Sequence, residues 1–371
     1  MTTLMRWFRY LWVLIRKEFL AILADPANRV TLIAPVFIQA VLFGYAASYD
    51  VNHVDYAVLD QSRSQSSQQV LAHLDGSGIF KRTADLQNNQ QIQQVINDRT
   101  ALAVIIIPAD FEDKLNSQEA SPIQVILDGR NSSTASMAGS YISSVVGQVN
   151  QERLGTNSAI TVQARTWYNP NVESRWGIMP SLIATLSMMQ TLLLSALSVA
   201  REREQGTFDQ LLVTPYTPTQ IMIGKAIPPI IIGVIQSSII LAIILFWFQI
   251  PMNGSLTLLY FGLFAFNIAV VGVGLSISAI ALNMQQAMLY TFFLIMPLTL
   301  LSGLLTPVQN MPEVLNWLTY ANPLRFGIDL VQRVYLEGAS FAQVKWDFVP
   351  MLILAIITLP LAAWLFRNRL S

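Results

Sequence analysis

The fold is decided by residues 226–248, which read AIPPIIIGVIQSSIILAIILFWF and contain no charged residue and no histidine. A helix of about 20 apolar residues crosses a bilayer core roughly 30 Å thick, whereas an apolar run of about 10–14 residues more often marks a buried core helix. Five further stretches share this property, and each of the six is 19 to 26 residues long. The six are residues 30–49, 177–200, 226–248, 257–282, 287–305 and 348–366. The sequence therefore predicts an α-helical membrane protein with six transmembrane helices.

The composition agrees with this prediction and narrows the possible functions. Charged residues make up 12% of the chain, about half the share in a typical soluble domain. The net charge is zero, which gives no reason to expect nucleic acid as a partner. The chain has no cysteine, so disulfides and thiolate metal sites are excluded. Its two histidines, His53 and His73, lack the spacing of metal ligands, and no metal site is predicted.

The basic residues predict the orientation in the membrane. With the N-terminus inside, the short inner segments carry ten Lys and Arg residues and the short outer segments carry three. Residues 50–176 are too long to count under the positive-inside rule. The excess predicts that both termini are cytoplasmic and that residues 50–176 lie outside. The first apolar stretch lacks a clear cleavage site, so it is predicted to remain as transmembrane helix 1, residues 30–49.

Residues 1–29 are predicted to form a cytoplasmic N-terminus with an amphipathic interfacial helix. A helical period separates apolar from basic residues over positions 4–24, as in helices that lie in the membrane interface. Asp25-Pro26 would end this helix before the first span. The expected apolar face contains Leu4, Phe8, Leu11, Ile15, Phe19 and Ile22, and the opposite face contains Arg6, Arg9, Arg16 and Lys17.

Residues 50–176 are rich in Gln, Ser and Asn and alternate strand and helix signals, which predicts an inserted α/β periplasmic domain. About 125 residues are enough to bury a core. The expected strands are 54–59, 101–107 and 123–127, and an extended run is expected at 159–167. The expected helices are 66–74, 85–97, 110–115 and 132–154.

The most informative short stretch is residues 201–215, which read REREQGTFDQLLVTP and begin where span 2 leaves the membrane on the inner side. Mixed charges come first, Gly206 permits a bend, and a short amphipathic helix from Thr207 would end before Pro215. Such a helix is too polar to insert and is suited to docking a soluble partner. A charged loop that only fixes the topology is the alternative interpretation.

This stretch resembles the coupling-helix signature of ABC-2 type exporter permeases: a glutamate-rich run, Gly-Thr, Leu-Leu and Thr-Pro. Two more stretches match the family in the same order along the chain. Residues 16–26 resemble its N-terminal interfacial helix. Residues 301–324, with Leu301-Ser302-Gly303 and Asn322-Pro323-Leu324, resemble the broken segment around the fifth span of the family and its outer re-entrant helices. The re-entrant segment is expected near residues 306–347. Transmembrane helices 2–6 are expected within residues 177–371.

The resemblance implies a permease subunit. The chain has no phosphate-binding G-x-x-x-x-G-K-[ST] motif, so we expect it to carry out no nucleotide chemistry of its own. The resemblance implies a cytoplasmic ABC ATPase subunit that uses ATP and magnesium, and a second permease, either an identical copy or a paralogue. It also implies a bacterial inner membrane location and suggests a periplasmic adaptor protein. The residues assigned to ATPase coupling are Lys17, Glu18, Glu202, Glu204, Gly206, Thr207, Leu211 and Pro215.

Polar residues inside the spans are the candidates for a substrate path, because polar groups are costly in lipid and tend to face protein or water. These candidates are Gln39, Gln190, Gln236 and Asn267. Hydrogen bonds between helices are the alternative explanation for each of them. Gly272 and Gly274, followed by serines at 276 and 278, indicate close helix packing.

The sequence therefore favours the permease subunit of an ATP-driven exporter that moves a hydrophobic or amphipathic substrate, with multidrug efflux as one candidate role. No span carries a titratable group, which argues against a proton-driven carrier. A membrane-anchored receptor that senses a ligand through residues 50–176 is the second hypothesis. Its weakness is that the predicted inner segments are too short to form a cytoplasmic signalling domain. An intramembrane enzyme is disfavoured, because no polar catalytic pair lies within the spans.

Overall fold

The computed structural model divides the chain into two compact units. One unit comprises Met1–Ser48 together with Trp167–Ser371, and the other comprises Tyr49–Thr166. The residues described are 3–24, 26–46, 53–117, 119–130, 132–154, 174–207 and 216–368.

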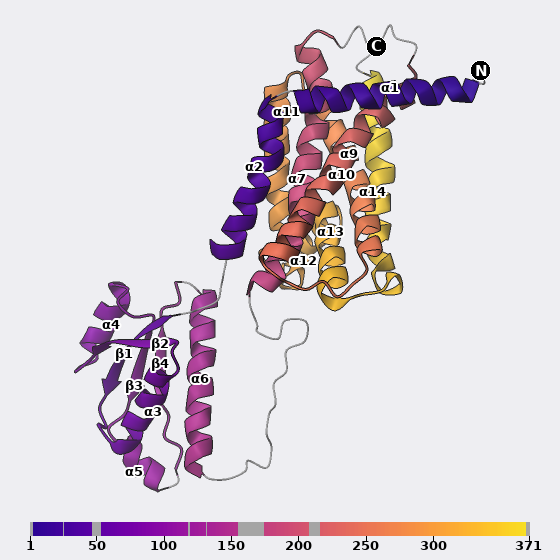
Figure 1. Cartoon of the computed structure of the whole chain (residues 1–371). Coiled ribbons are helices and arrows are strands. Elements are labelled where there is room, and N and C mark those ends of the chain that lie inside the picture. The colour runs from indigo at the N-terminus through magenta and orange to yellow at the C-terminus, as the bar shows by residue number, and fades with distance from the viewer. Residues whose placement is uncertain are drawn as a thin grey trace. The chain divides into compact units, whose positions relative to one another are not determined.

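The first unit is a bundle of long helices (Figure 1), with α7 at its centre, packed against α9, α10, α11 and α13. Within the residues described, its α-helices are α1 (Thr3–Ala24), α2 (Pro26–Val41), α7 (Ser174–Glu204), α9 (Pro218–Ala242), α10 (Leu256–Ile280), α11 (Met284–Leu300), α12 (Glu313–Thr319), α13 (Pro323–Gln332) and α14 (Phe341–Asn368). Short π-helical turns follow α2, α9 and α13 at Leu42–Ala46, Ile243–Trp247 and Arg333–Glu337, and a 3₁₀ turn covers Val308–Asn310.

Four helices in the described part of the chain are long and apolar enough to cross a membrane. They cover Arg175–Glu204, Thr219–Trp247, Leu256–Ile280 and Phe341–Arg367. Two further apolar helices, Leu32–Tyr45 and Met284–Leu300, are shorter. The chain is thus mostly helical with several apolar helices, and the six-span count remains a prediction. Helix α11 ends early because Leu301-Ser302-Gly303 forms a turn in which Gly303 has φ +92°.

Small residues allow the central helices to approach closely, as the sequence predicted. An added Cβ at Gly272 would lie 2.1 Å from Thr358 Oγ1 of α14, and one at Gly274 would lie 1.8 Å from Ser195 Oγ of α7. One turn farther along α10, Ser278 Oγ accepts hydrogen bonds from the backbone of α7. Helix α10 therefore contacts α7 and α14 through small side chains and hydrogen bonds, as is common between membrane helices.

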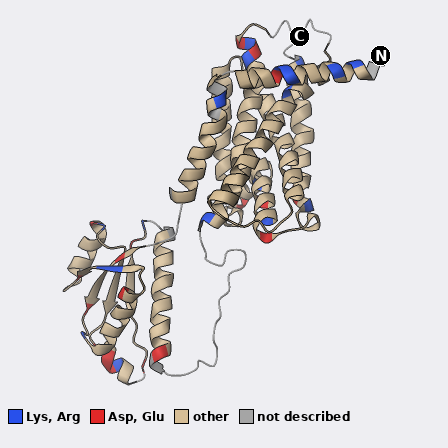
Figure 2. Ribbon diagram, in the orientation of Figure 1, with Lys and Arg blue, Asp and Glu red and all other residues tan. Residues whose placement is uncertain are grey.

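Charged residues of the first unit lie along α1 and near the two ends of the bundle, and the middle of the bundle is apolar (Figure 2). Helix α1 lies across the end of the bundle at which α7 ends and α9 begins (Figure 1). It buries Leu11, Leu14, Ile15 and Ile22. Phe8, which the sequence placed on this face, is 57% exposed. The distribution of charge agrees with a membrane-embedded protein.

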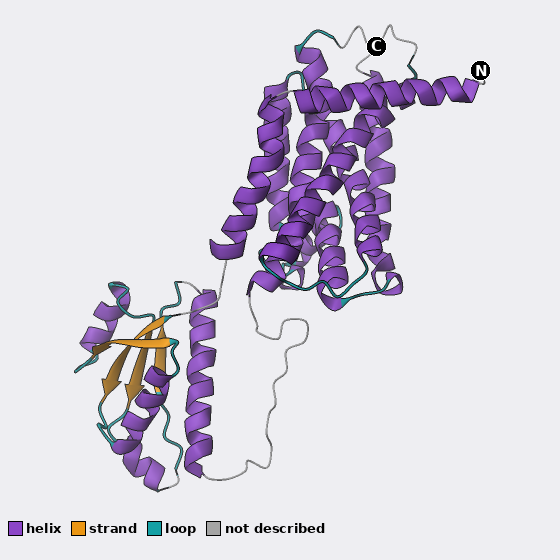
Figure 3. Ribbon diagram, in the orientation of Figure 1, coloured by secondary structure: helices purple, strands orange, loops and turns teal. Residues whose placement is uncertain are grey.

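The second unit is a four-stranded sheet with helices packed on both faces (Figure 3). The strand order is β2-β1-β3-β4, with β1 parallel to β2 and β3, and β4 antiparallel to β3. The strands are β1 (Val54–Asp60), β2 (Phe80–Asp85), β3 (Ala103–Ile107) and β4 (Gln124–Leu127). The helices are α3 (Gln65–Gly76), α4 (Gln90–Asn97), α5 (Phe111–Asn116) and α6 (Ser132–Leu154).

Sequence reasoning predicted three of these strands and missed β2. As an edge strand β2 buries Phe80 and exposes most of its other residues, so it lacks the apolar alternation of a half-buried strand. The helix expected from residue 85 begins at Gln90 instead, because Asp85 is the last residue of β2. The expected extended run at 159–167 lies outside the described residues.

A buried tyrosine in the second unit gives the protein a titration that can be tested. Tyr56 is fully buried in β1, and its hydroxyl donates a hydrogen bond of 2.6 Å to Asp75 Oδ1. Burial, followed by this hydrogen bond, raises the pKa of Tyr56 well above its ordinary value. The stability that Tyr56 contributes is therefore fully present below about pH 10, the pKa of tyrosine in the unfolded chain. It is lost as the pH rises through the higher pKa of Tyr56 in the folded chain.

We expect the folded chain to keep Tyr56 protonated at about pH 11, where exposed tyrosines ionise. Absorbance at 295 nm, taken as the difference between the full chain and Tyr56→Phe, should show no phenolate step near pH 10. A step at that pH would contradict the buried hydrogen bond.

Candidate functional site

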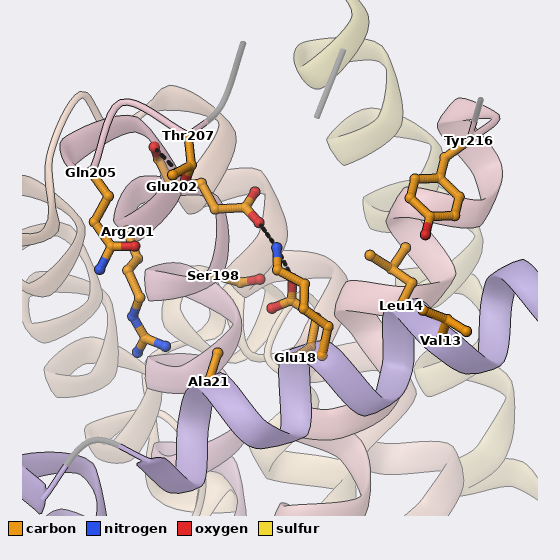
Figure 4. A pocket seen from close by; sticks show the side chains of 11 residues that line it. Val13, Leu14, Glu18, Ala21, Ser198, Arg201, Glu202, Gln205, Thr207 and Tyr216 are labelled. Carbon is orange, nitrogen blue, oxygen red and sulfur yellow. Dashed lines mark hydrogen bonds and ion pairs between the residues drawn. The ribbon is translucent and has the colours of Figure 1, made fainter. Parts of the chain in front are cut away.

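Four charged side chains meet where α1 crosses the bundle. Figure 4 labels two of them, Glu18 and Glu202. Lys17 and Glu18 come from α1, Glu202 from the last turn of α7, and Lys225 from the second turn of α9. Lys225 Nζ lies 3.1 Å from Glu18 Oε1 and 2.9 Å from Glu202 Oε2. Lys17 Nζ lies 2.6 Å from Glu202 Oε1 and 3.5 Å from Glu18 Oε1. We call these four residues the charge cluster.

The charge cluster is largely removed from solvent. The side chain of Lys225 is fully buried, and those of Glu18 and Glu202 are 8% and 7% exposed. Lys225 Nζ also lies 3.4 Å from the carbonyl and hydroxyl oxygens of Ser198. Its contact with Glu202 Oε2 is an ion pair without hydrogen-bond geometry. Isolated charges would be unstable here, so the cluster holds together because each ammonium lies near two carboxylates.

Lys17 is the exposed member of the cluster, with 51% of its side chain accessible. Partial burial acts to lower its pKa, but the hydrogen bond to Glu202 and the charges of Glu18 and Glu202 outweigh burial and raise the pKa above its ordinary value. Lys17 therefore stays charged throughout the physiological range.

The local fold of α9 explains why a lysine can be buried at position 225. An added Cβ at the preceding Gly224 would lie 2.5 Å from Leu14 Cδ2, so only glycine lets α1 pack this closely on α9. Thr217 and Gln220 form a capping box at the start of α9. The side-chain amide of Gln220 also donates to the carbonyl of Trp7 in α1. Two side chains of α9, Gln220 and Lys225, thus bond to α1.

The other predicted coupling residues have different positions. Glu204 Oε2 accepts a hydrogen bond from Met284 N and so caps α11 instead of joining the cluster. Gly206 has φ +67°, a left-handed conformation that ends α7. Thr207 donates from both its backbone N–H and its hydroxyl to the carbonyl of Glu202. Leu211 and Pro215 lie outside the described residues.

A cavity of about 370 Å³ opens beside the charge cluster. The cluster residues in its wall are Lys17, Glu18 and Glu202, and Arg201 adds a further positive charge. Its walls come from α1, the end of α7 and Tyr216 (Figure 4). Along the chain, the end of α7 precedes residues 208–215 and Tyr216 follows them. The cavity and its charges are suited to receiving a polar group from another protein.

The structure places three of the four substrate-path candidates together and the fourth apart. Gln39, Gln190 and Gln236 line one cavity within the bundle. Asn267 is fully buried in α10, where its Oδ1 accepts hydrogen bonds from Ser187 and Thr191 of α7. Its amide donates to the carbonyl of Leu263 in the same helix, and the two hydrogen bonds from α7 join α7 to α10.

Sequence reasoning did not assign Lys225 to the site. A signal was present, because Lys225 is one positive charge within the apolar run Ile221–Pro229. Glu18 gave a second signal, since it falls at the helical spacing of Leu11, Ile15 and Ile22 on the buried face of α1. Two opposite charges in apolar surroundings indicate a pair.

Comparison with known proteins agrees with these features. The family model described as ABC-2 family transporter protein matches residues 30–364. The chain is 40% identical to the probable multidrug ABC transporter permease YbhR of Escherichia coli strain K12, over 98% of this chain and 99% of the relative. It is 29% identical to the probable multidrug ABC transporter permease YbhS of the same strain, over 87% of each chain. The inner membrane transport permease YhhJ of that strain is 24% identical over 99% of each chain. The resemblance drawn from the sequence is thus confirmed: this chain belongs to the ABC-2 family of transporter proteins and is a permease subunit of an ABC transporter.

Proposed function

We propose that this permease exports a hydrophobic or amphipathic molecule from the cytoplasm or the inner leaflet of a bacterial inner membrane, driven by ATP hydrolysed with magnesium in a separate ATPase subunit. Multidrug efflux is the role suggested by the names of the relatives YbhR and YbhS. Two permease subunits, identical or paralogous, would pair in the membrane, and a periplasmic adaptor protein would extend the path outward.

The observation that carries this proposal is the charge cluster. It joins α1, α7 and α9, and the last two are the helices on either side of residues 208–215. A partner that moves this segment would therefore act on three helices at once. The adjoining cavity supplies Arg201 and the exposed Lys17 as contacts for acidic groups of that partner. The cluster thus supports ATPase docking at the inner end of the bundle.

Reconstitution tests the proposed function. The full chain should copurify with an ABC ATPase, and the pair should move the lipophilic dye Nile red across phosphatidylethanolamine–phosphatidylglycerol vesicles when ATP and magnesium are added. The matched control is an ATPase whose phosphate-binding lysine is replaced by alanine, which should stop dye movement. Equal dye movement by the permease alone would refute the assignment, and recovery of the chain without an ATPase would favour the receptor hypothesis.

A further inference from the structure

The cavity lined by the three glutamines of the predicted spans, Gln39, Gln190 and Gln236, has the composition of a ligand site. It measures about 420 Å³ and lies between α2, α7, α9 and α11. Apolar side chains form most of its wall, including Met189, Met288 and Phe292, and none of the described residues that line it is charged. Ligand sites are typically apolar cavities of this size with a few polar groups that orient the ligand.

Gln190 supplies a hydrogen-bond donor that the protein itself does not use. Its side chain is 6% exposed, and its Nε2 has no hydrogen-bond partner among the described residues. Unpaired buried donors are unfavourable and uncommon in folded proteins. Asn267, in the same bundle, shows the usual arrangement, with its amide and carbonyl groups both bonded. The free donor of Gln190 therefore points to an acceptor supplied by a bound molecule.

The position of Gln190 limits what that molecule can be. It lies near the middle of α7, about 20 Å of helix from either end. Lipid acyl chains at that depth carry no acceptor, and a charged ligand would lose its hydration without finding an opposite charge in the wall. Gln236, 4% exposed, lines the same cavity from α9.

We propose that this cavity binds neutral, mostly apolar molecules that carry a carbonyl or ether oxygen, and that the Gln190 amide donates a hydrogen bond to that oxygen. The inference rests on the proposed function, because it assigns a substrate class to the membrane path. It also makes a prediction that needs no ATPase: the permease alone binds such a molecule at this place.

Photolabelling with benzophenone tests the proposal directly. Benzophenone is a neutral two-ring ketone, and a cavity of about 150 Å³ already accommodates one benzene ring. Under near-ultraviolet light it inserts into nearby C–H bonds. With the full chain in phosphatidylethanolamine–phosphatidylglycerol nanodiscs, peptide mass spectrometry should locate adducts at Met189 and Met288. The anionic analogue 4-benzoylbenzoate should label these positions at least tenfold less.

The role of the amide is tested by a variant and by a pair of competitors. Gln190→Leu keeps the side-chain volume and should reduce labelling about threefold to tenfold, the factor expected for one neutral hydrogen bond. Ser238→Ala, a polar deletion on α9 away from the cavity wall, should leave labelling unchanged. In the unmodified chain, fluorenone should compete with benzophenone more strongly than fluorene, which has the same rings and no carbonyl.

Three results would overturn the proposal: adducts spread over lipid-facing residues only, equal labelling by the anion, or equal competition by fluorene and fluorenone. If labelling fails while ATP-driven dye transport persists, the binding site is wrong and the exporter assignment stands. If labelling succeeds and no ATPase associates, the site stands and the exporter assignment fails.

Discussion

Replacing Lys225 with methionine should destabilise the folded chain by about 3–5 kcal/mol, the cost of removing one partner from a buried ion pair. Methionine fills a similar volume, so the loss comes from charge. Glu18, 8% exposed, would keep only Lys17 at 3.5 Å as a counter-charge. Unfolding free energies of the detergent-solubilised chain, measured by titration with a denaturing detergent, would give the value.

Two matched variants separate the effect of charge from a general effect of mutation. Lys345→Met removes an exposed lysine from α14 and should change the unfolding free energy by less than about 0.5 kcal/mol. The double variant Glu18→Gln with Lys225→Met leaves Glu202 paired with Lys17 at 2.6 Å and should recover most of the loss. If Lys225→Met costs no more than Lys345→Met, the cluster does not stabilise the end of the bundle that α1 crosses.

The second large effect is expected at Gly274, where α10 meets α7. An alanine Cβ there would lie 1.8 Å from Ser195 Oγ and 2.9 Å from the carbonyl oxygen of Leu192. The hydroxyl could rotate away, but the carbonyl belongs to the backbone of α7, so the two helices must separate. Overpacking of this kind costs about 1–3 kcal/mol, and Gly274→Leu should reach or exceed the upper value. The fraction of chain that stays monodisperse during gel filtration after heating would report the loss.

Gly177→Ala is the matched control: among the described residues, no atom lies within 4 Å of a Cβ added at Gly177, apart from its chain neighbours and the nearby backbone of α7. Alanine favours the helix over glycine by up to about 1 kcal/mol, so this variant should be neutral or more stable. Adding Ser195→Ala to Gly274→Ala should relieve part of the strain, since it removes the nearest atom. Equal stability of Gly274→Leu and Gly177→Ala would show that α7 and α10 do not pack as described.

The sequence predicted the class of protein well, because apolar length is a property of the chain alone. Lys17, Glu18 and Glu202 were assigned to ATPase coupling through the family resemblance, and the structure brings these three together. The sequence could not predict that Glu204, two residues beyond Glu202, accepts a hydrogen bond from α11. That contact depends on the direction in which the side chains at the end of α7 point.

The polar residues within the predicted spans show the same limit. Gln39, Gln190, Gln236 and Asn267 look equivalent in sequence, as polar residues within apolar spans. Their different environments arise from the neighbours that packing provides: Ser187 and Thr191 satisfy Asn267, whereas Gln190 faces a cavity. Which polar residue is structural is decided by contacts between spans, and spacing within one span carries no information on them.

The hydrogen bonds around Asn267 have a mechanical consequence. Ser187 and Thr191 of α7 each have one hydroxyl proton, which is shared between Asn267 Oδ1 of α10 and a backbone carbonyl of α9. The carbonyl is that of Gly233 for Ser187 and that of Pro229 for Thr191. Sliding any of these three helices past another would break several bonds in a medium without water to replace them. We therefore expect these three helices to shift as one rigid block, so that a change in the shape of the Gln190 cavity would come from movement of α2 and α11, which form its other walls.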